Sequence, residues 1–367
     1  MIELSAISGR NILVMAGGTG GHVIPALAVA EELRLRGMKI EWLGTLNGIE
    51  SELVVNANFP ITYIRVSGLR GKGIVGLLLA PFKLLLALGQ SMVAVVRIKP
   101  VCVLGMGGFA SGPGGLAAWL LRKPLVIHEQ NAVAGLTNTL LYRLAKRVLT
   151  AFPGVFGKQG DKGECVGNPI RKTIINIPAP EQRLAGRQGS IRLLIVGGSL
   201  GAMVLNETVP QALALMTEEE RPEVWHQTGK RHQEVTLANY KNARVAAKVE
   251  PFIADMDEAY CWADVIVCRS GALTVSEIAS AGLASILVPY PHAVDDHQTA
   301  NARYLEQAGA AVIINQNNFT SEQFMTLLAG TFSDRSKILA MAKNARQVAQ
   351  LGATEKVADR CLEVCCA

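Results

Sequence analysis

The sequence predicts an α/β protein made of two doubly wound domains, each built on a parallel sheet. The chain has 367 residues, which is long for a single hydrophobic core, and 50% of them are hydrophobic. Short β-forming runs alternate with helix-like stretches, and this alternation starts again near residue 191. Glycine-rich turns follow β-forming runs in both halves. The halves are therefore expected to be Rossmann-like domains that face each other across a cleft.

The first domain is predicted over residues 1–168. Its helix at 25–36 lies between two buried β-forming runs, which is the rhythm of a parallel sheet. Its strands are expected at residues 11–15, 39–43, 101–104 and 125–127.

The second domain is predicted over residues 169–345, after a stretch punctuated by Gly and Pro. The last helical stretch runs from 336 to 366, and its final part, about 346–367, is expected to pack back on the first domain. The strands of the second domain are expected at residues 191–196, 224–225, 246–249, 264–268 and 285–288.

The glycine-rich turns predict binding of phosphates. Glycine lets the backbone approach an anion closely, and a helix that begins after the turn points free N–H groups at it. His22 in the first turn adds a group that can carry a proton near neutral pH. The turns span residues 17–22, 105–115 and 197–201.

The composition excludes several classes. The seven cysteines form no C-x-x-C pair, so neither a disulfide framework nor a zinc site is indicated. Residues 1–10 lack the basic and apolar blocks of a signal peptide, so the protein is expected to stay inside the cell. The 5% aromatic content weighs against RNA binding, and no nucleic-acid partner is expected.

Positive charge is concentrated in the first half of the chain. Residues 1–168 hold 17 Lys and Arg against 9 Asp and Glu, a net charge of +8. Between residues 60 and 147, Glu129 is the only acidic residue. An anionic ligand or surface is therefore the expected partner.

The basic region encloses the most apolar stretch of the chain, residues 74–90. Pro81, Lys83 and Gln90 interrupt it, so a membrane-spanning helix is not expected. Either a helix lying at a membrane interface or a buried helix with a basic rim fits the pattern. The candidate membrane patch consists of Ile74, Leu78, Phe82, Lys72 and Lys83.

Several longer motifs occur in a fixed order along the chain, and together they closely resemble those of the MurG family of bacterial GT-B glycosyltransferases. The resemblance covers the chain from Ile12 to its end. The motifs are residues 15–22, 67–72, 105–115, 128–131, 167–171, 269–277 and 292–301.

The resemblance implies a GT-B fold and inverting transfer of N-acetylglucosamine from UDP-N-acetylglucosamine to the 4-hydroxyl of N-acetylmuramic acid in lipid I. The products would be lipid II, a peptidoglycan precursor, and UDP. Because the polyprenyl tail of lipid I stays in the bilayer, the enzyme is expected at the cytoplasmic face of the cell membrane as a peripheral protein. That consideration favours the interfacial interpretation of residues 74–90. An anionic phospholipid surface is the implied partner, and other cell-wall synthesis proteins are possible partners.

His22 is the first candidate for the general base, since a neutral imidazole suits removal of a proton from a sugar hydroxyl. It could instead only hydrogen-bond a phosphate or the sugar. The same pocket would be lined by Thr19, Gly20 and Gly21. Glu129 is an alternative base and could equally be a structural ion-pair partner.

The second domain is expected to hold the donor, with the helix that starts after Ser270 forming an anion site for the diphosphate. Glu277 fits a capping box with Thr274, whereas the resemblance assigns it to the ribose hydroxyls. The resemblance gives Gln298 to the sugar ring, and Arg171 could be structural instead. The full set of inferred donor contacts is Asn131, Arg171, Ser199, Ile253, Ala272, Leu273, Thr274, Val275, Ser276, Glu277 and Gln298.

No metal or other cofactor is expected. Asp255 and Asp257 imitate a metal-binding Asp-x-Asp pair but are interpreted as helix-capping residues. The resemblance places Asp295 and Asp296 in the donor-sugar loop.

Three other functions remain alternatives. Residues 105–110 fit the G-x-G-x-x-A pattern of a nicotinamide dehydrogenase, although the repeat of the domain argues against it. A non-catalytic sugar-nucleotide or lipid-binding protein would keep the glycine turns without needing His22. A GT-B transferase that acts on a different glycolipid or small-molecule acceptor is the nearest rival.

Overall fold

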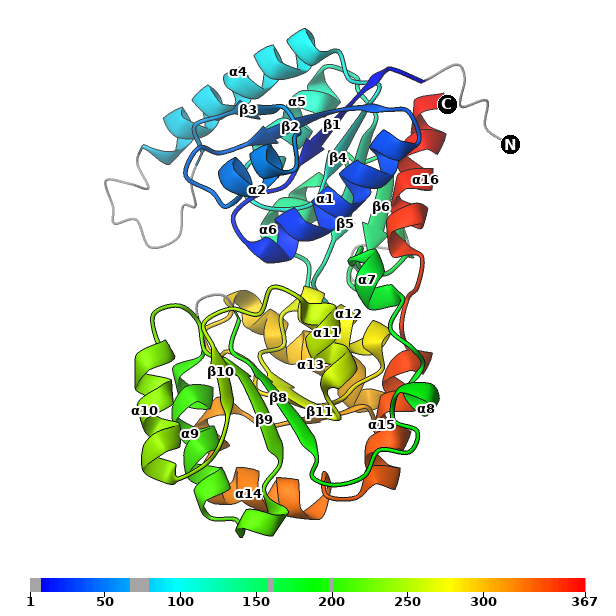
Figure 1. The fold of residues 1–367 in the computed structure, drawn as a ribbon. Coiled ribbons are helices and arrows are strands. Elements are labelled where there is room, and N and C mark those ends of the chain that lie inside the picture. Colours follow the sequence, from blue (N-terminus) through cyan, green and yellow to red (C-terminus); the bar gives the residue numbers. More distant parts are fainter. Residues whose placement is uncertain (1–7, 67–78, 158–161, 199–200, 367) are drawn as a thin grey trace. The chain divides into compact units, whose positions relative to one another are not determined.

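The computed structural model describes residues 8–66, 79–157, 162–198 and 201–366, and it forms two compact units (Figure 1). Unit 1 comprises Met1–Arg171 and Gly352–Ala367, and unit 2 comprises Lys172–Leu351. The sequence placed the corresponding boundaries at 168/169 and about 345/346. The chain therefore leaves unit 1 once and returns to it with its last helix.

Unit 1 is built on a seven-stranded parallel sheet with the strand order β3-β2-β1-β4-β5-β6-β7. The order reverses between β1 and β4, and the loops after these two strands meet at the carboxyl edge of the sheet, where such folds bind ligands. The strands are β1 (Asn11–Met15), β2 (Lys39–Gly44), β3 (Ile61–Tyr63), β4 (Cys102–Gly105), β5 (Leu125–Glu129), β6 (Arg147–Thr150) and β7 (Gly163–Cys165).

Helices cover both faces of this sheet (Figure 1). Ile12 and Val14 of β1 pack with α1 and α16 on one face, whereas Leu13 and Met15 pack with α4, α5 and α6 on the other. This alternation follows from the two-residue period of a strand. The helices are α1 (Gly20–Leu35), α2 (Glu50–Asn56), α4 (Ala80–Ile98), α5 (Ser111–Leu120), α6 (Leu136–Leu141) and α16 (Ala353–Cys366).

Unit 2 has the same kind of architecture, built on a six-stranded parallel sheet in the order β10-β9-β8-β11-β12-β13. Its strand order reverses between β8 and β11. The strands are β8 (Arg192–Val196), β9 (Glu223–Gln227), β10 (Lys248–Glu250), β11 (Val265–Cys268), β12 (Ala284–Leu287) and β13 (Ala311–Ile313). The helices are α7 (Lys172–Ile175), α8 (Pro180–Arg183), α9 (Met203–Ala214), α10 (Gln233–Ala243), α11 (Met256–Trp262), α12 (Ala272–Ala281), α13 (His297–Gln307), α14 (Ser321–Gly330) and α15 (Arg335–Gln347), with short 3₁₀ turns η2 (Glu218–Glu220), η3 (Val294–Asp296) and η4 (Gln316–Asn318).

The structure confirms the α/β class and the predicted pair of parallel sheets, one in each unit, and it differs from the sequence prediction in several elements. Strands β3, β6, β7 and β13 were not predicted. The first helix begins at Gly20 rather than at 25, because its glycines already lie in the first helical turn. The predicted stretch 336–366 is two helices, α15 and α16, with Gly352 at a φ of +77° between them. Glycine adopts this conformation without steric cost, so the chain can turn there.

The core of unit 2 holds a histidine that must be neutral to fit. One ring nitrogen of His226 lies 2.9 Å from the Tyr240 hydroxyl and the other lies 3.0 Å from the Asn206 Oδ1. Because Asn206 Oδ1 can only accept, the facing nitrogen carries the hydrogen, and Tyr240 can donate to the other nitrogen. Burial lowers the pKa of His226 to about 3.

Because His226 stays neutral in the folded state, we predict that the free energy of unfolding of unit 2 falls at acid pH. The unfolded chain takes up a proton near pH 6.5 while folded His226 does not, so stability falls as the pH drops from 6.5 toward 3. Between pH 7.5 and 5.0 the loss is about 2 kcal/mol for this group. Calorimetric unfolding at both pH values should show a smaller fall for His226→Gln than for wild type. The exposed His292→Gln control should fall like wild type, and an undiminished fall in His226→Gln would contradict the assignment.

Candidate functional site

The two glycine-rich turns of unit 1 are packed against each other where the strand order reverses. The Met106 N–H donates to the Met15 carbonyl at 2.7 Å, which joins the segments after β4 and β1. Gly108 has a φ of +84°, and a Cβ added to it would lie 2.3 Å from the Gly17 carbonyl oxygen. At this position glycine is required for close approach of the two backbones, in addition to any role toward a phosphate.

His22 lies in the first turn of α1, on top of the second glycine turn. A Cβ on Gly107 would lie 2.7 Å from His22 Cδ2, so the imidazole rests directly on this backbone. Thr19 Oγ1 lies 3.3 Å from His22 Nδ1. Thr19 is exposed and His22, Gly20 and Gly21 are half-buried, so the group is open to a ligand. The arrangement presents one histidine at the ligand-binding edge of the sheet.

Glu129, the alternative base, is buried at the end of β5 and organises the loop that follows. Its Oε1 accepts from the Asn131 N–H at 3.0 Å. Its Oε2 accepts from the Gly135 N–H at 3.1 Å and from Asn138 Nδ2 at 2.8 Å. These donors occupy both oxygens, which favours a structural role and places Asn131 in a loop that Glu129 holds.

The neighbouring His128 is also buried. It lies 2.9 Å from the Gly167 carbonyl through Nε2, and burial lowers its pKa to about 4.

In unit 2, helix α12 starts at the corresponding reversal point, directly after β11. Its N-cap residue is Gly271, so Ala272, Leu273 and Thr274 form the first helical turn. Backbone N–H groups of a first turn have no partner inside the helix and point outward, and the helix dipole makes this end positive. The first turn of α12 therefore has the outward N–H groups and the positive helix end that an anion site requires. Val275 and Ser276 follow on the same helix, and the Ser276 hydroxyl donates to the Ala272 carbonyl at 2.9 Å.

The capping-box interpretation of Glu277 is wrong. Thr274 lies inside the helix rather than at its N-cap, so the two side chains cannot form the box. Instead, Glu277 is buried and its Oε2 accepts from the Tyr260 hydroxyl at 2.9 Å. Tyr260 was missed at the sequence level because it lies on α11, 17 residues away.

Other predicted donor contacts lie on loops around this edge. The Ile253 N–H donates to Gln227 Oε1 at 2.9 Å, so Gln227, which the sequence analysis did not single out, holds the Ile253 loop. Gln298 Oε1 accepts from the Tyr290 N–H at 2.9 Å. Arg171 is the last residue of the first segment of unit 1 and is half-buried.

Four predicted site residues lie outside the described part of the chain: Ser199, Ile74, Leu78 and Lys72.

The acidic pairs show no metal-binding arrangement. Asp255 occupies the N-cap position of α11 as predicted, but its side chain makes no capping hydrogen bond. Asp295 and Asp296 both adopt left-handed backbone conformations, with φ of 52° and 50°. Among the described residues, no group of three or more His, Cys, Asp or Glu side chains is placed to hold a metal ion.

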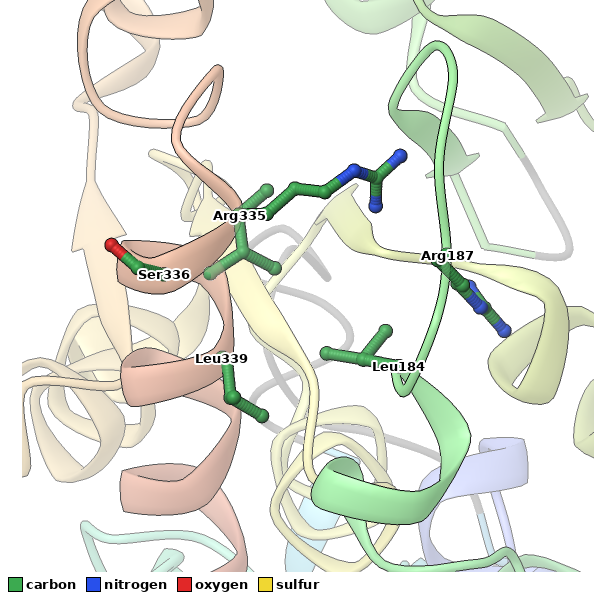
Figure 2. A pocket seen from close by; sticks show the side chains of 6 residues that line it. Leu184, Arg187, Arg335, Ser336 and Leu339 are labelled. Carbon is green, nitrogen blue, oxygen red and sulfur yellow. The ribbon is translucent and has the colours of Figure 1, made fainter.

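A cavity of about 260 Å³ in unit 2 lies away from these residues (Figure 2). Arg187 and Arg335 beside it are already engaged, since both donate to the buried carboxylate of Asp264. It is lined by Leu184, Arg187, Arg335, Ser336, Ile338 and Leu339. None of the predicted site residues lines this cavity, and it is assigned no ligand.

The comparisons with known proteins identify the class as glycosyltransferases. Residues 12–150 match the glycosyltransferase family 28 N-terminal domain, and residues 192–361 match the C-terminal domain of that family.

The close relatives are UDP-N-acetylglucosamine–N-acetylmuramyl-(pentapeptide) pyrophosphoryl-undecaprenol N-acetylglucosamine transferases. The one from Marinobacter nauticus is 55% identical over 96% of this chain and 97% of its own length. The one from Nitrosococcus oceani is 53% identical over 96% and 98%. The crystal structure of Acinetobacter baumannii MurG is 43% identical, with a TM-score of 0.85 over 96% of this chain and 99% of that one. The chain belongs to this MurG family of N-acetylglucosaminyltransferases.

Family membership removes the dehydrogenase and the non-catalytic alternatives. The kitacinnamycin glycosyltransferase, at 16% identity and a TM-score of 0.70, shares the fold alone. The roles of the individual site residues stay predictions.

Gly108→Ala should disturb the site of unit 1. The added Cβ meets the Gly17 backbone and the positive φ disfavours alanine, which together cost about 3 kcal/mol. We expect a melting temperature lower by roughly 5 °C or more and a fall in transferase activity. The control is Gly330→Ala in α14, which has no atom within 4 Å of the new Cβ. Equal behaviour of the two variants would show that the contact between the turns is unimportant.

Proposed function

We propose that this chain transfers N-acetylglucosamine from UDP-N-acetylglucosamine to lipid I, the undecaprenyl-pyrophosphoryl N-acetylmuramyl-pentapeptide, giving lipid II and UDP. The observation that carries the proposal is the 55% identity to a transferase named for this reaction, over almost the full length of both chains. A different glycolipid or small-molecule acceptor is less favoured, since the natural-product transferases among the structural neighbours are below 20% identical.

On the acceptor side, His22 acts as the general base in this proposal. It removes the proton from the 4-hydroxyl of N-acetylmuramic acid while the oxygen attacks the anomeric carbon opposite UDP. One displacement inverts the configuration, so an α-linked donor gives a β-linked product. The support is that His22 is half-buried at the carboxyl edge of the sheet, with its ring held over Gly107 and beside Thr19.

On the donor side, unit 2 binds UDP-N-acetylglucosamine and stabilises the departing diphosphate. The first turn of α12 supplies N–H groups where negative charge grows as the glycosidic bond breaks. The Oε2 of Glu277 accepts a hydrogen bond from the Tyr260 hydroxyl, which orients the carboxylate for its proposed contact with the ribose hydroxyls.

The proposal includes docking of α4 on an anionic phospholipid surface at the cytoplasmic face of the membrane. Among the described residues, α4 is the one helix long and apolar enough to cross a membrane by length and composition. One face of α4 is buried in the core of unit 1, through residues such as Ala87, Ala94 and Val95. The opposite face is apolar and exposed. A helix with one face in the core and one apolar face in solvent fits an interfacial position better than a span.

The exposed face of α4 extends beyond the predicted patch. Phe82 is 71% exposed, and Leu85, Leu86, Val93 and Val96 continue the apolar surface along the helix. Lys83 is exposed among them and can meet anionic headgroups. Other cell-wall synthesis proteins could be recruited to the same membrane.

His22→Ala tests the catalytic proposal. We expect transfer of labelled N-acetylglucosamine to a lipid I analogue to fall by about 10²- to 10⁴-fold, the range typical for loss of a general base. The KM for UDP-N-acetylglucosamine should change little, because unit 2 binds the donor. Near-normal turnover would exclude the base role, whereas absence of transfer by wild type that still binds the donor would point to another acceptor.

The membrane proposal is tested by replacing Phe82, Leu85 and Val93 together with serine. Removal of this exposed apolar area should lower binding to anionic vesicles by about tenfold or more, while turnover of a short-chain soluble acceptor stays within about twofold. Leu215→Ser in unit 2, where the leucine is also exposed, is the matched control. A parallel loss of vesicle binding and soluble turnover would mean that the substitutions disturb the fold of unit 1, and it would contradict a separate docking role.

A further inference from the structure

A buried carboxylate that plays no part in the mechanism above lies directly behind the first glycine turn. Glu50, the first residue of α2, has no exposed surface. Its Oε2 accepts from the Gly18 N–H at 3.1 Å. Its Oε1 accepts from the Thr45 N–H at 2.9 Å and from Thr45 Oγ1 at 2.7 Å. One side chain therefore joins the loop after β1 to the loop after β2.

Three glycines make room for this carboxylate. A Cβ on Gly48 would lie 2.0 Å from Glu50 Oε2, and one on Gly17 would lie 2.6 Å from Oε1. A Cβ on Gly44 would lie 2.8 Å from Glu50 Cγ. Real Cβ atoms do not approach so closely, so the surrounding backbone is shaped to the side chain.

Hydrogen bonds from Gly18 and Thr45 stabilise the Glu50 carboxylate. None of the ion pairs between residues that the structure describes includes Glu50. A buried carboxylate without a cation needs several well-placed donors, and here two are backbone N–H groups. Glycine-rich turns commonly donate such N–H groups to a bound phosphate. Here the Gly18 N–H already donates to the Glu50 carboxylate. The turn is thus ordered before any substrate binds.

We infer that Glu50 is a positioning residue for the transfer reaction, which holds the Gly18–Thr19 segment so that His22 is presented correctly. Thr19 follows Gly18 directly and its hydroxyl contacts the His22 ring, so a shift of Gly18 is passed to the imidazole through one residue. The inference rests on the proposed role of His22 as the base. Catalytic geometry tolerates little displacement, so loss of the anchor lowers turnover without touching the donor.

The first test is Glu50→Gln, with Glu52→Gln as the control. The amide keeps the shape of the side chain but places an NH₂ group against one of the donors, which breaks that contact. We expect kcat to fall about tenfold, while the KM for UDP-N-acetylglucosamine stays within about twofold. Glu52 is exposed on the same helix, and its variant should behave like wild type. Wild-type kcat in folded Glu50→Gln would overturn the inference.

A double-mutant cycle separates positioning from general support of the fold. If Glu50 acts through His22, Glu50→Gln should reduce the residual turnover of His22→Ala by less than about twofold. The same tenfold loss in both backgrounds would assign Glu50 a purely structural role and overturn the inference, leaving the proposed function intact. An undiminished kcat in His22→Ala alone would instead exclude the proposed base role of His22.

Thr45→Val covers the case in which Glu50→Gln does not fold. It removes only the hydroxyl contact to Glu50 and leaves the two backbone donors in place. We expect a kcat loss of about threefold that disappears in the His22→Ala background. No loss, or an equal loss in both backgrounds, would overturn the inference.

Discussion

The close approach of two backbones at the carboxyl edge of the unit 1 sheet determines the geometry of the candidate acceptor site. Because β1 and β4 are neighbours at the point where the strand order reverses, their turns share one space, and Gly108 lies against Gly17 with no room for a side chain. That contact fixes the start of α1 and with it His22. Gln130 extends the arrangement, since its Nε2 donates to the Met106 carbonyl at 2.8 Å. The histidine is therefore placed by backbone packing together with the Thr19 contact to its ring.

In the proposed mechanism, the two units use the same topology for different chemical tasks. In unit 1, the buried carboxylates of Glu50 and Glu129 accept hydrogen bonds from the backbone N–H groups of Gly18 and Gly135, respectively. Those donors therefore serve to order loops. In unit 2, α12 begins at Ala272, after the N-cap residue Gly271, and directs the N–H groups of its first turn outward. A leaving diphosphate gains negative charge during transfer and needs such donors, whereas proton removal from a hydroxyl needs mainly a correctly oriented base.

The sequence predicted the features that depend on neighbouring residues. Buried strands such as β1 and the glycine turns after them have local patterns, and their positions agree with the structure within a few residues. The sequence could not reveal Glu50, because its carboxylate contacts Gly18, which lies 32 residues away. The capping box at Glu277 failed for a related reason. The local pattern fitted, but the helix begins at Ala272, two residues before Thr274, and Glu277 accepts from Tyr260 on another helix.

The β1 strand links the proposed membrane face to the proposed base within one rigid element. Leu13 and Met15 pack in the cluster that includes α4, while Ile12 and Val14 pack in the cluster that includes α1. A lipid-linked acceptor cannot leave the membrane surface, so its reactive hydroxyl has a limited range of heights above that surface. If α4 rests on the membrane, the thickness of the sheet and its two helices sets the height of His22. Docking by a helix in the core of the same unit thus contributes to orienting the acceptor, beyond raising its local concentration.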